Sequence, residues 1–290
     1  MAGLKTIGVV GAGQMGAGIA QVCAIAGYSV RLHDVDAARI DAARDDVGKG
    51  LEKLAAKGKV EDPAGALARL EAAPDVGDLA VCDLVVEAAV EDEAVKRAIY
   101  ASLKAVLPPA TFLASNTSSL SITRLAAASD RPERFIGLHF MNPVPVMKLV
   151  ELIRGIQTSD ETFEMARGLV EALGKEAAVS EDYPAFIVNR ILIPMINEAC
   201  YALYEGVGTV TSIDMAMKLG ANHPMGPLEL ADFIGLDTCL AIMRVLHEDL
   251  SDTKYRPCPL LAKYVEAGWL GRKTGRGFYD YRGDTPVPTR

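Results

Sequence analysis

Short hydrophobic runs alternate with longer amphipathic segments through roughly the first 180 residues. The runs are apolar and rich in β-branched residues, which is typical of buried strands, and the segments between them have helical length and spacing. The predicted strands are residues 6–10, 29–33, 84–87, 111–114, 135–140 and 146–150, and the best-defined helices are 14–26 and 37–57. Strands alternating with helices indicate βαβ units, so we expect an α/β domain with a mostly parallel sheet.

The pattern changes after Tyr183-Pro184. One long run rich in Ile, Leu, Met and Ala has helical spacing, and shorter helical stretches follow it with no convincing strand among them. The predicted helices are 186–205, 213–219, 228–233, 236–250 and 259–267. We therefore predict two domains, an α/β domain over residues 1–184 and an all-α C-terminal domain over residues 185–290.

Composition limits which binding partners and which cellular location we expect for this protein. The 290-residue chain has a net charge of −8, which argues against nucleic acid and anionic membrane surfaces as partners. The N-terminus runs straight into a strand pattern, so we expect no signal peptide, and no apolar stretch has the length of a membrane span. The five cysteines are scattered without metal-ligand spacing, so we expect free thiols, no metal site and a cytoplasmic location. They are Cys23, Cys82, Cys200, Cys239 and Cys258.

The segment Gly11-Ala12-Gly13-Gln14-Met15-Gly16 has the G-x-G-x-x-G pattern between a predicted strand and a predicted helix. The glycines allow a tight turn, a close approach of pyrophosphate to the backbone, and close packing of helix on strand. Asp34 ends the second strand, where a carboxylate accepts hydrogen bonds from ribose hydroxyls and repels a 2′-phosphate. The pattern favours a Rossmann-type NAD site over an FAD site or a glycine-rich loop without a ligand.

A group of lysines lies along and just after the second predicted helix, at residues 49, 53, 57 and 59. Two readings stay open for this group in an otherwise acidic chain. The lysines can form a solvated helix face, or they can bind a substrate that carries phosphate groups.

An enzyme that oxidises an alcohol with NAD needs a base for the hydroxyl proton, and histidine has the appropriate pKa. Of the four histidines, His139 is predicted at the carboxyl end of a strand, where ligands bind in open α/β folds. Glu151 follows the turn-prone segment after it and can orient the imidazole and stabilise the imidazolium. The alternative is a surface hairpin that carries a histidine.

Two further polar positions have competing interpretations. Ser118 follows a strand end, where its hydroxyl can bind the substrate oxygen or cap the helix that begins nearby. Asn189 lies within the long apolar helix, either in a buried structural network or facing a cleft.

The chain resembles the L-3-hydroxyacyl-CoA dehydrogenases, and most closely the bacterial 3-hydroxybutyryl-CoA dehydrogenases. The matching segments span nearly the whole chain in order and form a highly specific combination. They are GVVGAGQMGAGIAQ, DLVVEAAVED, ASNTSSLSIT, GLHFMNPVPVMKLVE, FIVNR, GANHPMGPLELADFIGLDT and GRKTGRGFY. The resemblance implies interconversion of (3S)-3-hydroxyacyl-CoA and NAD⁺ with 3-oxoacyl-CoA, NADH and a proton, and a homodimer formed through the C-terminal helical domain.

The resemblance also implies a role for each matching residue. His139 would be the catalytic base and Glu151 its partner, while Asn189 and Ser118 would contact the substrate. The cofactor would be bound by Gly11, Gly13, Gln14, Met15, Gly16, Asp34, Glu91, Lys96 and Asn142, with Ser118 touching it too. Lys57 and Gly50 match positions that bind the CoA portion of the substrate.

The chain departs from the family pattern at one position. The family commonly has Pro-Gly-Phe before the long helix where this chain has Pro184-Ala185-Phe186, so we expect a slightly different domain junction.

Two rival functions also remain open. One rival is a related dehydrogenase acting on a sugar acid such as L-gulonate, which would need no CoA-binding lysines. The other is a non-catalytic NAD-binding or structural relative. Such a protein would have no chemical need for His139, Glu151 and Asn189, so their presence together argues against it.

Overall fold

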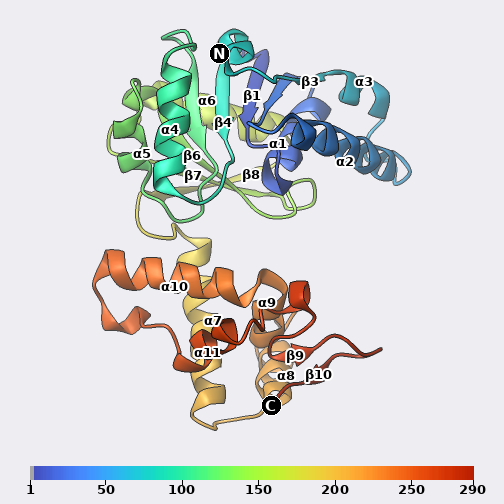
Figure 1. The fold of residues 1–290 in the computed structure, drawn as a ribbon, viewed down its shortest axis with the longest axis vertical. Helices are drawn as coiled ribbons and strands as arrows, with labels where there is room; N and C mark the ends of the chain where they lie inside the picture. The colour runs from blue at the N-terminus through green and yellow to red at the C-terminus, as the bar shows by residue number, and fades with distance from the viewer. Residues whose placement is uncertain (1–2) are drawn as a thin grey trace. The chain divides into compact units, whose positions relative to one another are not determined.

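The computed structural model describes residues 3–290 and divides into two units, the first ending at Tyr183 and the second running from Pro184 to Arg290. The boundary lies one residue before the predicted one. Figure 1 shows the two units, an α/β unit and a largely helical one.

The first unit contains a single eight-stranded sheet in the order β3-β2-β1-β4-β5-β6-β7-β8. Neighbouring strands are parallel except for the antiparallel pair β6 and β7, which confirms the predicted mostly parallel sheet. The strands are β1 (Thr6–Val10), β2 (Ser29–His33), β3 (Leu70–Ala72), β4 (Leu84–Glu87), β5 (Phe112–Ser115), β6 (Phe135–Phe140), β7 (Leu149–Arg154) and β8 (Glu176–Glu181). The helices are α1 (Gln14–Ile25), α2 (Ala37–Ala55), α3 (Pro63–Ala68), α4 (Glu93–Lys104), α5 (Ile122–Ala128) and α6 (Asp160–Ala172), with 3-10 turns at Val76–Val81 and Pro132–Arg134.

The sequence pattern missed both edge strands and misplaced a third. β3 has three residues, and β8 is mostly exposed and rich in Ala and Glu, so neither forms an apolar run. The strand predicted at residues 146–150 begins instead at Leu149, because the chain after the predicted start is still in the turn that follows β6.

Strand alternation sorts the central side chains onto two faces of the sheet. Even-numbered residues of β4, β6 and β7, such as Val86, Leu138 and Leu152, pack in one core with α1, α2 and α6. The odd-numbered residues face α4 and α5, as the edge-to-face contact of Tyr100 with Phe135 shows. Glu87, His139 and Glu151 are odd-numbered members of these strands, so they share the α4–α5 face of the sheet (Figure 1).

The second unit is built on a helical core, as predicted. Its helices are α7 (Val188–Tyr204), α8 (Val210–Gly220), α9 (Pro227–Ile234), α10 (Leu236–Leu250) and α11 (Pro259–Glu266), with 3-10 turns at Thr253–Tyr255 and Arg272–Thr274. The expectation of no strand is wrong in one detail, because β9 (Tyr279–Asp280) and β10 (Val287–Pro288) form a two-residue antiparallel pair. Their pairing involves too few residues to leave a period-two pattern.

The C-terminal segment is held against this helical core by hydrogen bonds to two buried aspartates. Asp232 on α9 accepts hydrogen bonds from the N–H groups of Phe278 and Tyr279 at 2.9 and 2.8 Å, and from the Tyr281 hydroxyl at 3.0 Å. Asp214 on α8 accepts a hydrogen bond from the Tyr279 hydroxyl at 2.8 Å.

The backbone at the start of the second unit has a conformation that usually requires glycine. Ala185 has φ of 63° and the next residue, Phe186, has φ of 53°, so both lie in the left-handed region. Ala185 adopts this conformation although it is an alanine, so it carries the strain that a glycine would not, and the slightly different domain junction stays a prediction. Its side chain is fully buried, so tertiary packing holds it there.

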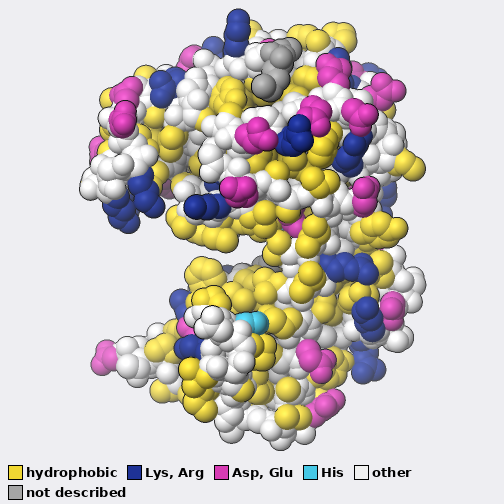
Figure 2. Space-filling view, turned by 180° about the vertical axis from the view of Figure 1, so that it is seen from behind, with side chains coloured by type: hydrophobic (Ala, Val, Ile, Leu, Met, Phe, Trp, Pro, Cys, Tyr) yellow, Lys and Arg dark blue, Asp and Glu magenta, His cyan; other side chains and the backbone are white. Residues whose placement is uncertain are grey.

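No helix within residues 3–290 combines the length and the apolar character needed to cross a membrane. On the face of the first unit seen in Figure 2, acidic and basic side chains are interspersed.

Candidate active site

The glycine-rich turn joins β1 directly to α1 and leaves no room for a side chain at Gly11 or Gly16. Gly11 has φ of 106°, and a Cβ built on it would lie 2.6 Å from the carbonyl oxygen of Ala88. A Cβ on Gly16 would lie 1.7 Å from the Gly11 carbonyl oxygen, whereas one on Gly13 would meet nothing within 4 Å. The open side at Gly13 leaves the backbone at the start of α1 accessible, as binding of a pyrophosphate requires.

Asp34 stands beside this turn and ties it to the end of β2. One carboxylate oxygen accepts a hydrogen bond from the Ala12 N–H at 2.8 Å, and the other accepts one from the Asp36 N–H at 3.1 Å. Each oxygen keeps a further lone pair that can accept a hydrogen bond from a ribose hydroxyl.

A cavity of about 430 Å³ extends from this turn over the end of β4. Gln14, Met15 and Asp34 line it, together with apolar residues from the end of β4 and from α4. The lining residues Val35 and Arg39 were not predicted, because an exposed valine and arginine at a helix start leave no distinctive sequence signal. A mostly apolar slot beside a carboxylate fits the adenosine portion of NAD.

His139 and Glu151 are directly opposite each other on the antiparallel strands β6 and β7. Opposite residues of such a pair point to the same face, which brings together two side chains that are twelve positions apart in the sequence. The His139 Nδ1 lies 2.6 Å from a carboxylate oxygen of Glu151, and both side chains are buried. An ionised carboxylate can only accept, so this contact places the imidazole hydrogen on Nδ1 and makes Nε2 the basic nitrogen.

Glu91 organises the turn that carries Ser118. A single carboxylate oxygen accepts hydrogen bonds from the Thr117 hydroxyl at 2.6 Å and from the N–H and hydroxyl groups of Ser118 and Ser119 at 2.8–3.1 Å. Burial alone would raise the pKa of Glu91, but the Lys96 ammonium and these donors lower the pKa below its usual value. Ser118 is therefore held by an ionised side chain and does not cap α5, which is capped by Ser121.

Lys96 lies beneath this turn, fully buried between two carboxylates. Its ammonium nitrogen is 2.6 Å from an oxygen of Glu87 and 3.5 Å from the second oxygen of Glu91. Glu87 also accepts hydrogen bonds from the Ala89 N–H, the Tyr100 hydroxyl and the Ser115 hydroxyl, at 2.7–2.9 Å. Direct contact of Lys96 with a cofactor stays a prediction.

Glu87 was recognised in the sequence only as the end of a buried strand. A charged residue at that position, followed nine residues later by a lysine on the next helix, is the signal that could have identified the pair.

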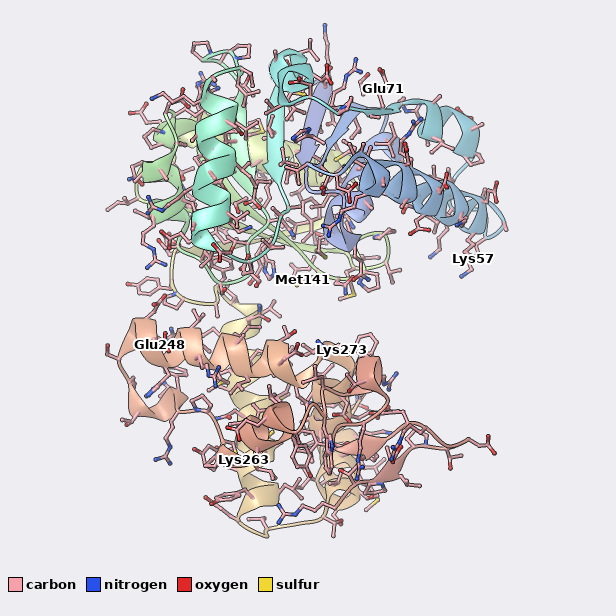
Figure 3. The ribbon with its side chains drawn as sticks, in the orientation of Figure 1. Lys57, Glu71, Met141, Glu248, Lys263 and Lys273 are labelled. Carbon is pink, nitrogen blue, oxygen red and sulfur yellow. The ribbon has the colours of Figure 1, made fainter. Side chains whose placement is uncertain are left out.

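Asn142 begins the turn after β6, where its peptide bond to Pro143 is cis. It lines a second cavity of about 300 Å³ with Gln14, Gly18 and Asp46, between α1 and α2. In Figure 3, Met141 marks the point where the chain leaves β6. The structure therefore places Asn142 beside the glycine-rich turn.

The predicted CoA-binding positions lie on α2 and just beyond it. Lys57 follows the helix end and is exposed, as are the other lysines of the group (Figure 3). Gly50 faces the amide of Gln21, which a Cβ would approach to 3.0 Å. Asn189 is half-buried in the first turn of α7 and belongs to the second unit, so its role at the site stays a prediction.

Comparisons with known proteins agree with this geometry. Residues 6–183 match the family described as 3-hydroxyacyl-CoA dehydrogenase, NAD binding domain, and residues 186–281 match the C-terminal domain of 3-hydroxyacyl-CoA dehydrogenase. A 3-hydroxybutyryl-CoA dehydrogenase of Bradyrhizobium diazoefficiens is 67% identical over 289 residues, which cover 99% of each chain. The crystal structure of (S)-3-hydroxybutyryl-CoA dehydrogenase from Ralstonia eutropha superposes with a TM-score of 0.94 at 49% identity, covering 97% of this chain and 100% of that one.

Proposed function

The chain belongs to the 3-hydroxyacyl-CoA dehydrogenase family, and from that premise we infer that it is an NAD-dependent oxidoreductase interconverting (3S)-3-hydroxybutyryl-CoA and acetoacetyl-CoA. The observation that carries the chemistry is the buried contact of 2.6 Å between His139 and Glu151 at the carboxyl end of β6. A surface hairpin with an incidental histidine would not bury both partners.

The residues around the glycine-rich turn fit NAD. The N–H groups at the start of α1 would bind the pyrophosphate, and Asp34 would accept hydrogen bonds from the adenosine ribose and repel a 2′-phosphate. NAD⁺, when bound, supplies the acceptor for the hydride that leaves the substrate carbon.

His139 handles the proton of the substrate hydroxyl. In the oxidising direction Nε2 takes this proton, and the Glu151 carboxylate stabilises the positive imidazolium that results. In the reducing direction the same nitrogen returns the proton to the substrate oxygen. Ser118, held by Glu91, and Asn189 are proposed to donate hydrogen bonds to that oxygen or to the thioester.

The exposed lysines after and along α2 are proposed to bind the phosphates of CoA. Lys49 and Lys53 are four positions apart on one helix face, and Lys57 follows the end of the helix. A sugar-acid substrate would make no use of them, so the lysine group favours CoA.

The test is NADH consumption with acetoacetyl-CoA, measured by absorbance in parallel reactions with NADH and NADPH. We expect fast oxidation of NADH and little of NADPH, because Asp34 repels the 2′-phosphate. Turnover with L-gulonate and NAD⁺, together with none on acetoacetyl-CoA, would replace the proposed substrate. Binding of NADH without turnover of either substrate would indicate a non-catalytic relative.

A homodimer through the second unit is also proposed. On α8, Met215 and Leu219 are 53% and 81% exposed and lie four positions apart, on one face of the helix. Exposed apolar side chains on one helix face are typical of a subunit interface. Light scattering should show a dimer that Leu219→Glu dissociates, while Lys218→Glu, a neighbouring change outside this apolar face, leaves it intact.

A further inference from the structure

Three charged side chains, Glu87, Glu91 and Lys96, lie in contact near the carboxyl ends of β4 and β5. Glu87 and Glu91 contribute two carboxylates, and Lys96 contributes one ammonium between them. Lys96 forms an ion pair with Glu87, and the N–H and hydroxyl donors around Glu91 favour the ionised form of that second carboxylate. The group therefore carries one net negative charge.

That charge is unevenly shared because the two carboxylates differ in their distance from Lys96. The ammonium nitrogen is 2.6 Å from Glu87 and 3.5 Å from Glu91. Glu87 is almost fully buried, whereas the side chain of Glu91 is 36% exposed. Glu87 therefore neutralises most of the lysine charge, and the uncompensated negative charge resides on Glu91.

Glu91 lies on the half of the sheet over which the nicotinamide portion of NAD would extend. In open α/β folds a dinucleotide crosses the point where the strand order reverses, which here is the boundary between β1 and β4. Asp34 and the glycine-rich turn are on the β1–β2 side, so the other end of the cofactor extends over β4, β5 and β6. Glu91 and Ser118 follow β4 and β5, and His139 ends β6 nearby.

We propose that Glu87 is a positioning residue which, by neutralising Lys96, leaves Glu91 negatively charged beside the nicotinamide and so raises the affinity for NAD⁺ relative to that for NADH. The nicotinamide ring is positively charged in NAD⁺ and becomes neutral when it accepts a hydride. A nearby net negative charge therefore stabilises the oxidised form over the reduced form. This inference rests on the NAD-dependent function proposed above.

The test is the ratio of the two dissociation constants, Kd(NADH) to Kd(NAD⁺), in the absence of substrate. NADH binding is followed by fluorescence and NAD⁺ binding by displacement of NADH. Glu87→Gln keeps the shape of the side chain, and the hydroxyls of Tyr100 and Ser115 can donate to or accept from the amide. The charge of the group changes from minus one to zero, so we expect the ratio to fall roughly three- to tenfold, the effect of a unit charge several ångströms away in a partly buried site.

Two control variants separate this electrostatic role from a structural one. Tyr100→Phe removes a hydrogen bond to Glu87 without changing any charge, so it should leave the ratio unchanged. Glu71→Gln makes the same chemical change on the edge strand β3, three strands from β4 and so about 14 Å away across the sheet (Figure 3). At that distance solvent and salt screen the charge, so the ratio should again be unchanged.

The proposal is overturned if Glu87→Gln leaves the ratio as it is in the wild type, or if Tyr100→Phe shifts it equally. Should Glu87→Gln fail to fold, Glu91→Gln removes the same charge from a partly exposed position, and an unchanged ratio there overturns the proposal too. Because no substrate is present, the result is independent of which hydroxyacyl compound the enzyme uses. A wild type that binds neither NADH nor NAD⁺ would instead contradict the proposed function.

Discussion

Both units bury carboxylates, but the partners of those carboxylates differ. In the first unit Glu151 faces His139 and Glu87 faces Lys96, which are groups that carry or acquire positive charge. In the second unit the hydrogen bonds to Asp214 and Asp232 come from backbone N–H groups and tyrosine hydroxyls. The first arrangement sets the charge at the proposed active site, and the second holds the C-terminal segment in place.

The pKa values follow the same division. Burial raises the pKa of Asp232 to about 6, and the neutral donors around it offset only part of that effect. The pKa of Glu91, whose side chain is 36% exposed, is lowered because Lys96 and the hydroxyl and N–H donors outweigh the partial burial that would raise it. The acids with cationic partners are thus the ones that lie at the proposed site.

The largest expected effect is on turnover when the His139–Glu151 contact is altered. Glu151→Gln retains the size of the side chain but no longer stabilises the imidazolium, so kcat should fall on the order of 100- to 10,000-fold. NADH binding and the thermal unfolding temperature should change little. Glu176→Gln, on the exposed start of β8, is a matched control that should leave kcat intact. Survival of near-normal turnover in Glu151→Gln would refute the orienting role.

A smaller effect, on stability alone, is expected when Asp232 of the second unit is replaced. Asp232→Ala leaves two buried N–H groups and a tyrosine hydroxyl without their acceptor, so the free energy of unfolding should fall by about 3 kcal/mol. Urea unfolding of the full chain measures this loss. Asp237→Ala removes a half-exposed ion pair with Lys273, and should cost at most about 1 kcal/mol. Equal losses in the two variants would mean that Asp232 does not fasten the C-terminal segment.

The smallest expected effect concerns the backbone at the start of the second unit. Ala185→Gly relieves a left-handed conformation that costs alanine about 1–2 kcal/mol, although glycine entropy and the lost buried methyl group offset part of the gain. We expect a net stabilisation of about 0.5 kcal/mol in urea unfolding. Ala199→Gly, a change at a buried position inside α7, should destabilise by about 1 kcal/mol. Destabilisation by both variants would show that Ala185 is unstrained.

Much of the site could be predicted because its chemistry is local in sequence. The glycine-rich turn, Asp34 and the strand endings at His139 and Ser118 each depend on a few neighbouring residues in a recognisable element. The edge strands β3 and β8 could not be predicted, since edge positions need no apolar run. The left-handed conformation of Ala185 also escaped prediction, because packing imposes it against the preference of the residue.

The sequence by itself predicted an α/β fold followed by a helical one, contained the glycine-rich turn, and pointed to His139 as the proposed base, because periodicity, turn residues and family motifs encode these features directly. Only the tertiary structure decided which acids meet which cations. The contact of Glu151 with His139 depends on the register of β6 and β7, and that of Glu87 with Lys96 depends on how α4 packs on the sheet. These charged side chains are distant in the sequence, so only folding brings each one to the partner that sets its chemical role.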